Sequence, residues 1–296
     1  MRSAAGQSIR SRVAAVVEVL CAFAVVHVTY RTVKYFTAIG TIERGAGTNF
    51  TPGVVMILFT AGVLLLCGRS FVNYGLTVAR WKEGLRLGMI WGLMLVGGGA
   101  LLMFFRLQYR PGSGPPGWDD GIVFGLACLA AVALFAWLGR RQHAVLSRIP
   151  VGTCVALLVV VPCLPLLLAW FYQRPLLRTG LAVSWLVVGA GVGEEVFFRG
   201  YIQSRINEAF GRPFRVRSVE FGAGLLVSTV LFGFLHTLNT VDYFLGRFTF
   251  AWGFGVATLG TGLLFACLRE ATGSILAGVV THGILDVLAS VPKLIQ

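Results

Sequence analysis

Residues 181–200 read LAVSWLVVGAGVGEEVFFRG. The apolar run that begins near Leu181 ends on two adjacent carboxylates, Glu194 and Glu195, and Arg199 follows four residues after the second. A charge at membrane depth costs ~2.5–3.5 kcal/mol on insertion scales, so such an acidic pair needs a compensating reason to exist. The stretch therefore predicts a membrane helix whose carboxylates have a partner, a function or both.

The rest of the chain has the composition of a membrane protein. Hydrophobic residues make up 56% of the 296 and charged residues 12%, with a mean hydropathy of +0.80, more apolar residues than a soluble domain can bury. Apolar runs long enough to span a membrane recur along the whole sequence. They lie near 13–33, 53–68, 87–105, 121–139, 151–172, 180–198, 219–236, 250–268 and 274–291. We predict an all-α fold, a polytopic transmembrane helical bundle of about eight to nine segments, of which the second is short enough to be re-entrant.

The net charge of +13 does not indicate a nucleic-acid-binding protein, because the basic residues lie in the connections between apolar runs and form no face. If all nine runs cross, the connections on the side of the N-terminus carry 16 of the 25 Lys and Arg residues, and those on the other side carry 9. This bias predicts a cytoplasmic N-terminus and an external C-terminus. Contact with anionic lipid headgroups accounts for the charge, so we expect the lipid bilayer and no nucleic acid as a partner.

We predict a single integral membrane domain over residues 1–296, with its functional core at 180–291. The six cysteines all fall within apolar runs and form no Cys-x-x-Cys pair, so neither a disulfide framework nor a zinc knuckle is predicted. Residues 200–211 are predicted to extend the helix of the acidic pair, with Tyr201, Ile202 and Ile206 turned toward apolar surroundings.

Some polar residues of the core are candidates for a structural role, and others are candidates for a catalytic role. Residues four apart share a helix face, so Glu195 can pair with Arg199, whereas Glu194 points about 100° away. His236 lies in a later apolar run and could, taken alone, be a packing residue. The same is true of His282 and Asp286, which are four apart. Together these acids and imidazoles, on separate spans, are typical of a proton-transfer site.

Other chemistries find less support in the residues. The metallopeptidase pattern His-Glu-x-x-His is absent, and so are a serine nucleophile motif and a phosphate loop. We therefore predict no metal and no cofactor, although Glu, His and Asp are all potential ligands. Glu18 is expected to form a buried hydrogen bond, and His27 is expected to lie outside the site.

Three motifs in this order resemble a known family. Glu194-Glu195-x-x-x-Arg199, Phe232-x-x-x-His236 and His282-x-x-x-Asp286 are similar to the motifs of the CAAX prenyl protease type II family, also called the CAAX protease and bacteriocin-processing (Abi) family, of intramembrane glutamic proteases. The resemblance covers roughly 180–291. It implies an endopeptidase without a covalent intermediate, in which Glu194 and His236 activate the attacking water. His282 and Asp286 would line the site and help to stabilise the oxyanion. Many relatives have Asn at the position of Asp286, so a role in orienting His282 is the better expectation.

The resemblance implies a membrane-anchored or lipidated protein or peptide as substrate. Arginine outnumbers lysine 22 to 3, which is typical of a GC-rich bacterial genome and favours a bacterial inner membrane. Three alternatives stay open at this point: a non-catalytic immunity or scaffold protein, a proton-coupled transporter and a metal-dependent intramembrane peptidase.

The layout of the spans presents one difficulty. In a simple up-and-down arrangement, Glu194 ends its span on one side of the membrane and His236 ends the next span on the other side. The two can meet only if the helices are longer or tilted, or if the span near 219 begins outside the membrane.

Overall fold

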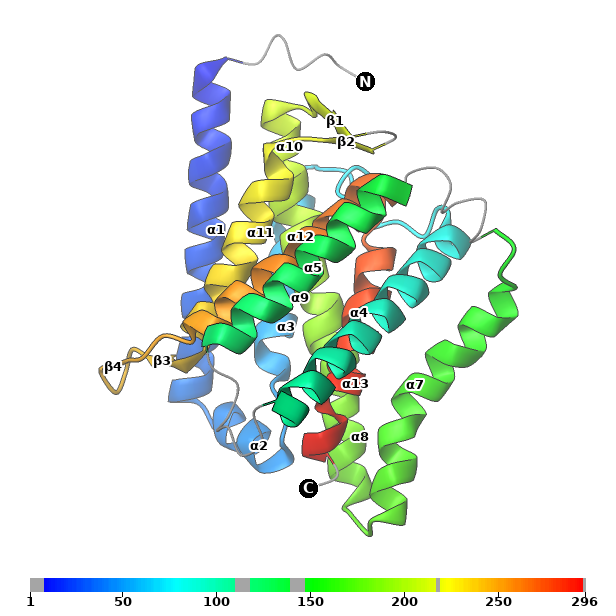
Figure 1. The fold of residues 1–296 in the computed structure, drawn as a ribbon. Coiled ribbons are helices and arrows are strands. Elements are labelled where there is room, and N and C mark those ends of the chain that lie inside the picture. The colour runs from blue at the N-terminus through cyan, green and yellow to red at the C-terminus, as the bar shows by residue number, and fades with distance from the viewer. Residues whose placement is uncertain (1–7, 110–117, 139–146, 217–218, 295–296) are drawn as a thin grey trace.

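The computed structural model describes residues 8–109, 118–138, 147–216 and 219–294, which are mostly helical (Figure 1). In chain order the first helices are α1 (Ile9–Phe36), α2 (Ile39–Ala46), α3 (Phe50–Leu66), α4 (Trp81–Tyr109), α5 (Trp118–Leu138), α7 (Val151–Phe171) and α8 (Leu176–Ser184). They are followed by η2 (Trp185–Val192), α9 (Gly193–Glu195), η3 (Val196–Gln203), α10 (Ser204–Phe210), α11 (Ala223–Thr237), η4 (Leu238–Thr240), α12 (Trp252–Thr272) and α13 (Leu276–Leu294). Two antiparallel hairpins pair β1 (Phe214–Val216) with β2 (Val219–Phe221) and β3 (Val241–Asp242) with β4 (Arg247–Phe248).

Eight helical segments of the described chain are long and apolar enough to cross a membrane. The second predicted run forms α3, which is apolar but only 17 residues long. The predicted all-α, polytopic helical bundle is thus confirmed. The run predicted to begin near 219 starts instead as strand β2, and its helix begins at Ala223. The division into one domain with a core at 180–291 stays a prediction.

Successive long helices run in opposite directions (Figure 1). The start of α1, the loop 67–80, α10 and the β1–β2 hairpin lie at one end of the bundle, which we name the N-face. Helix α2, the β3–β4 hairpin and the end of α13 lie at the opposite end, the C-face.

The helix that carries the acidic pair is longer than its apolar run. Segments α8, η2, α9, η3 and α10 follow one another without a break from Leu176 to Phe210, with π-type turns on both sides of Glu194 and Glu195. Such π turns occur frequently at functional sites. The predicted helical extension after Arg199 is present, with Tyr201 and Ile202 buried, and its end, α10, packs against α1 and α11. The acidic pair is therefore in the middle of a helix and not at its end.

Helices α3 and α9 meet backbone to backbone at two glycines. A Cβ atom added to Gly193 would lie 2.5 Å from the Cα atom of Gly53 and 3.0 Å from its carbonyl oxygen. Small residues permit this close approach between membrane helices. The contact fixes the position of the acidic pair, which directly follows Gly193, against α3.

Gly193→Ala is expected to lower the thermal stability of the protein, although alanine is the better helix former. Overfilling a packed contact costs ~1–3 kcal/mol, which exceeds the ~0.5–1 kcal/mol gained by removing a glycine from a helix. The matched control is Gly180→Ala on the same long helix, where the nearest atom to an added Cβ is Leu166 Cδ2 at 3.7 Å. Thermal unfolding in mild detergent should show a lower midpoint for Gly193→Ala alone. Equal shifts in the two variants would contradict the close approach.

Charged residues near the N-face are paired with one another. Glu18 on α1 accepts hydrogen bonds from Arg69, from the Tyr201 hydroxyl at 2.8 Å and from Arg205 Nε at 2.8 Å. Glu18 is thus hydrogen-bonded as predicted, but its side chain is 28% exposed and therefore only partly buried. All six cysteines are free, with Cys128 and Cys154 buried in the core.

Candidate active site

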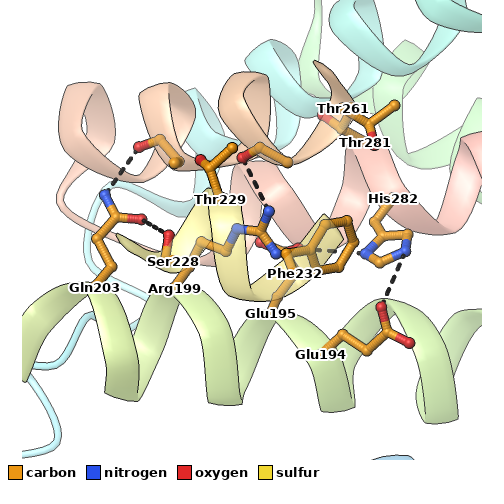
Figure 2. A network of polar contacts seen from close by, with 12 residues as sticks. Glu194, Glu195, Arg199, Gln203, Ser228, Thr229, Phe232, Thr261, Thr281 and His282 are labelled. Carbon is orange, nitrogen blue, oxygen red and sulfur yellow. Dashed lines mark hydrogen bonds and ion pairs between the residues drawn. The ribbon is translucent and has the colours of Figure 1, made fainter. Parts of the chain in front are cut away.

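The three motifs come together around one carboxylate oxygen of Glu194. Oε2 of Glu194 on α9 lies 3.8 Å from Nε2 of His236 on α11 and 3.9 Å from Nε2 of His282 on α13. Figure 2 shows Glu194 and His282 facing each other from their two helices. Residues that are 42 to 88 positions apart in the sequence are therefore side by side.

The length of the central helix explains how Glu194 and His236 meet. His236 is in the last turn of α11, at its C-face end, as the sequence predicts. The expectation that Glu194 ends its span was wrong, because the helix continues to Phe210. Glu194 therefore lies deep within the bundle at the same height as His236, and the difficulty raised by a simple up-and-down layout disappears.

Glu195 and Arg199 form the predicted pair. Arg199 Nη1 lies 3.1 Å from Glu195 Oε1, and both side chains are 0% exposed. Arg199 also donates from Nη2 to the carbonyl oxygen of Gly262 at 2.9 Å, and its guanidinium lies 4.2 Å from the centroid of the Phe232 ring. A buried charge requires such compensation. This pair is a structural element of the site, as Figure 2 shows.

His236 has its hydrogen-bonding pattern fixed by its own helix. Its Nδ1 atom lies 2.8 Å from the carbonyl oxygen of Phe232, one turn earlier. Because a carbonyl only accepts, Nδ1 carries the proton in this contact. In the neutral ring, Nε2 then presents a lone pair toward Glu194.

His282 lies between carboxylates on both sides of its ring. Its Nδ1 atom is 3.3 Å from Oε1 of Glu195, and its Nε2 atom is 3.4 Å from Oδ2 of Asp286. The ring also stacks on Phe265, with centroids 4.9 Å apart. These contacts hold the plane of the imidazole, so that Asp286 and Glu195 orient His282 toward Glu194.

The Glu194 oxygen between the two histidines has no hydrogen-bond partner among the described residues, although it is buried. Buried polar atoms in native proteins are satisfied by protein or by ordered water. Separations of 3.8 and 3.9 Å are too long for direct hydrogen bonds and leave room for a bridging water molecule. This geometry is suited to bind a water molecule between Glu194 and the two histidines.

A cavity of about 1300 Å³ reaches this point. Glu194, His236, His282 and Asp286 all line it. Much of the remaining wall is apolar, including Trp185, Leu186, Phe232, Phe254, Phe265 and Leu285. This volume exceeds the ~300–1,000 Å³ that is usual for small-molecule sites, so the cavity has room for a peptide segment.

A comparison with models of protein families shows which family this sequence resembles. Residues 155–288 match the model described as Type II CAAX prenyl endopeptidase Rce1-like. This region belongs to the CAAX protease family. The match contains all three motifs and confirms the family resemblance of the sequence. No curated protein and no solved structure matches the chain.

The match to this family model indicates that the chain is a protease. Together with the eight apolar helices of the described residues, the match identifies an integral membrane protein and implies a membrane-embedded protein substrate. In the part of the chain that the structure describes, no group of three or more His, Cys, Asp or Glu side chains is arranged to hold a metal ion.

Helix α1, which lies outside the region that matches the family model, contributes cavity residues that sequence reasoning missed. Tyr30 and Arg31 line the cavity wall. The Tyr30 hydroxyl lies 2.8 Å from Nδ1 of His27, whose Nε2 lies 3.1 Å from the Tyr243 hydroxyl. His27 therefore contacts Tyr30, which lines the cavity, but His27 itself is not among the lining residues. The spacing of His27, Tyr30 and Arg31, three and four apart on one helical face, was the available signal.

Proposed function

We propose that this protein is a glutamic-type intramembrane endopeptidase, which hydrolyses a peptide bond with water activated by Glu194 and His236. The observation that carries the proposal is the unpartnered, buried Glu194 oxygen that faces two imidazole nitrogens at the inner end of a large cavity. A carboxylate in hydrogen-bond reach of a water is suited to act as a general base.

In the proposed reaction, a single water molecule donates one hydrogen bond to Glu194 and its other hydrogen bond to the lone pair of His236 Nε2. The water oxygen attacks the carbonyl carbon of the scissile bond while one proton of the water passes to Glu194. A tetrahedral intermediate forms, with negative charge on the former carbonyl oxygen. Glu194 then delivers the proton to the leaving nitrogen as the carbon–nitrogen bond breaks. The products are a new carboxylic acid, which then gives up the second proton of the water to the new amine, and no covalent enzyme intermediate is involved.

His282 is suited to stabilise the oxyanion. Its Nδ1 atom donates to Glu195, which Arg199 holds in place, and Nε2 faces the cavity. A protonated Nε2 in this position is a preorganised donor, and removing such a donor typically costs about 10²–10³ in rate. An ionised Asp286 accepts hydrogen bonds but cannot donate, so we assign it to the orientation of His282 and not to the oxyanion.

We further propose that the substrate is a membrane-anchored or lipidated protein or peptide and that the enzyme resides in a bacterial inner membrane. The apolar wall of the cavity supports the first proposal, since an apolar anchor would be accommodated beside the scissile bond. The high Arg-to-Lys ratio supports the second.

The proposal is tested by comparing membranes from cells that express wild-type protein, Glu194→Gln or His236→Ala at matched levels. Mass spectrometry would follow new protein termini, with and without a chelator. We expect products in the wild type, none in Glu194→Gln and a strong reduction in His236→Ala. Survival of these products in chelator supports a metal-independent reaction, and their loss would overturn that part of the proposal. Identical termini in all three membranes would favour a scaffold or a transporter.

A further inference from the structure

Arg31 of α1 is a cation in the wall of the active-site cavity. Its Nη2 atom donates to the carbonyl oxygen of Leu238 at 2.8 Å and reaches that of Asn239 at 3.4 Å. Leu238 directly follows α11 and is two residues beyond His236. The guanidinium is therefore held next to the helix end that carries the histidine of the proposed water-activating pair.

This guanidinium contacts no carboxylate within the described chain, in contrast to other cations near the cavity. Lys34, one turn further along α1, lies 3.0 Å from Oε2 of Glu43. Arg199 has its partner in Glu195 at 3.1 Å. Arg31 is partly buried, and neither its Nη1 nor its Nε atom has a hydrogen-bond partner among the described residues. Because a partly buried cation is costly without an opposite charge, Arg31 is suited to receive an anion from the cavity.

A second hydrogen-bond donor comes from a chain of three side chains that begins beside Arg31, whose guanidinium lies 5.6 Å from the centroid of the Tyr30 ring. The Tyr30 hydroxyl contacts Nδ1 of His27, and the Tyr243 hydroxyl contacts Nε2 of the same ring. A neutral imidazole has one N–H group and one lone pair, so it donates to one tyrosine and accepts from the other. The tyrosine that accepts keeps its own O–H group. Because both tyrosines line the cavity, one hydroxyl donor remains for a bound molecule in either tautomer.

The chemistry of these donors matches a carboxylate. The guanidinium and the remaining tyrosine O–H group only donate here, and an ionised carboxylate only accepts. Hydrogen bonds between arginine and a carboxylate are charge-assisted and roughly twice as strong as neutral ones. In a polypeptide, this group is the side chain of Asp or Glu or the C-terminal carboxylate. A lipid phosphate offers similar acceptors, but the cavity leads to Glu194, which favours a polypeptide as the occupant.

We propose that Arg31, with Tyr30 and Tyr243, forms a subsite that binds a carboxylate of the substrate polypeptide. Arg31 would then select substrates that carry this group at a set distance from the scissile bond, because the bound carboxylate fixes which peptide bond meets Glu194. The word substrate rests on the proposed function, whereas binding of the carboxylate requires no catalysis. The two proposals can therefore be tested separately.

The subsite is tested by peptide binding to the Glu194→Gln protein in mild detergent, so that binding is measured apart from cleavage. Three dye-labelled apolar peptides of equal length would be compared. The first has an aspartate and an amidated end, the second an asparagine and a free C-terminal carboxylate, and the third, which is neutral, an asparagine and an amidated end. We expect an acidic peptide to bind about 10–100-fold more tightly than the neutral one, the usual contribution of a hydrogen bond to a charged group. Which acidic peptide binds identifies the source of the carboxylate, and equal binding of all three would overturn the proposal.

Adding Arg31→Gln should remove this preference, and adding Arg31→Glu should favour a peptide with lysine in place of the aspartate. The matched control is Arg44→Gln, which removes the same charge from the same cavity. Arg44 is exposed and donates from Nη2 to Thr41 Oγ1 at 3.1 Å, so the preference should remain in this variant. An equal loss in Arg31→Gln and Arg44→Gln would indicate a general charge effect and overturn the subsite.

Two other outcomes would also overturn the proposal. Equal weakening of all three peptides in Arg31→Gln, together with a lower midpoint of thermal unfolding, would assign Arg31 to the packing of α1 against α11. Loss of the preference on addition of phosphatidylglycerol, but not of phosphatidylcholine, would assign the subsite to a lipid headgroup.

Proteolysis gives an independent readout in membranes that contain the active protein. New termini that depend on Glu194 should have a carboxylate at one fixed distance from the cleaved bond, and these termini should decline about 10–100-fold in Arg31→Gln. Carboxylates at random distances would overturn the role of Arg31 in selection. Absence of any termini that depend on Glu194 would contradict the proposed function instead, and the peptide measurement would still decide whether the subsite exists.

Discussion

Glu194→Gln is expected to reduce proteolysis by about 10²–10⁴-fold or more, the contribution of a positioned general base, without loss of folded protein. Gln has nearly the shape of Glu but cannot take a proton from water. The Glu194 oxygen that faces the histidines makes no hydrogen bond within the described structure, so folding loses no contact there. Removing a buried charge relieves a desolvation cost, and the midpoint of thermal unfolding should therefore stay the same or rise. The measurement is the rate of product formation from a substrate identified by its new termini, alongside thermal unfolding in detergent.

The matched control for this change is Glu208→Gln, the same substitution further along the same continuous helix. The Glu208 side chain is 52% exposed, accepts a hydrogen bond from the Tyr74 hydroxyl at 2.9 Å and is not among the residues that line the cavity. Its replacement should leave the rate of proteolysis unchanged. Normal turnover by a well-folded Glu194→Gln protein would rule out Glu194 as the base. Equal losses in the two variants would point to a general effect of the substitution on the helix.

Local spacing predicted contacts within the candidate site, but it did not predict how the surrounding helices pack. The four-residue interval between Glu195 and Arg199 is a property of the helix itself, and it produced the observed pair. The order of the three motifs indicated the family, and the structure brings Glu194, His236 and His282 together. The short second helix also followed from the length of its apolar run.

Features that depend on tertiary packing could not be predicted in the same way. The hydropathy of the sixth run falls after Arg199, so the membrane span was expected to end near Glu194, with residues 200–211 as a helical extension beyond it. Gln203, Ser204 and Asn207 are instead buried because α11 and α12 supply their hydrogen-bond partners. Tyr30 reaches the cavity because α1 contacts α11, for example through the rings of Phe23 and Phe234, and no local pattern in α1 specifies this contact. Polar residues within membrane helices thus indicate that hydrogen-bond partners exist, but only the fold shows which residues those partners are.

Arg199→Ala is expected to destabilise the protein by about 3–5 kcal/mol, the usual consequence of removing one member of a buried ion pair. The change leaves the carboxylate of Glu195, which is 0% exposed, without its cation and removes the guanidinium from between the rings of Phe232 and Phe265. Thermal unfolding in mild detergent and the yield of folded protein would measure the loss. Arg80→Ala is the control, since Arg80 is 59% exposed in its pair with Glu83 and exposed pairs contribute about 0–1 kcal/mol.

The double variant Glu195→Gln/Arg199→Met separates the charge of this pair from its role in the site. Removing both charges should recover much of the stability lost in Arg199→Ala, because a buried ion pair can be replaced by neutral residues of similar size at little cost. The amide oxygen introduced by Glu195→Gln would still accept a hydrogen bond from His282 Nδ1, but without the arginine this side chain would no longer be held in place. Stability should therefore return further than activity. If Arg199→Ala were as stable as the wild type, the pair would not support the active site. If the double variant recovered activity and stability equally, the pair would matter only for folding.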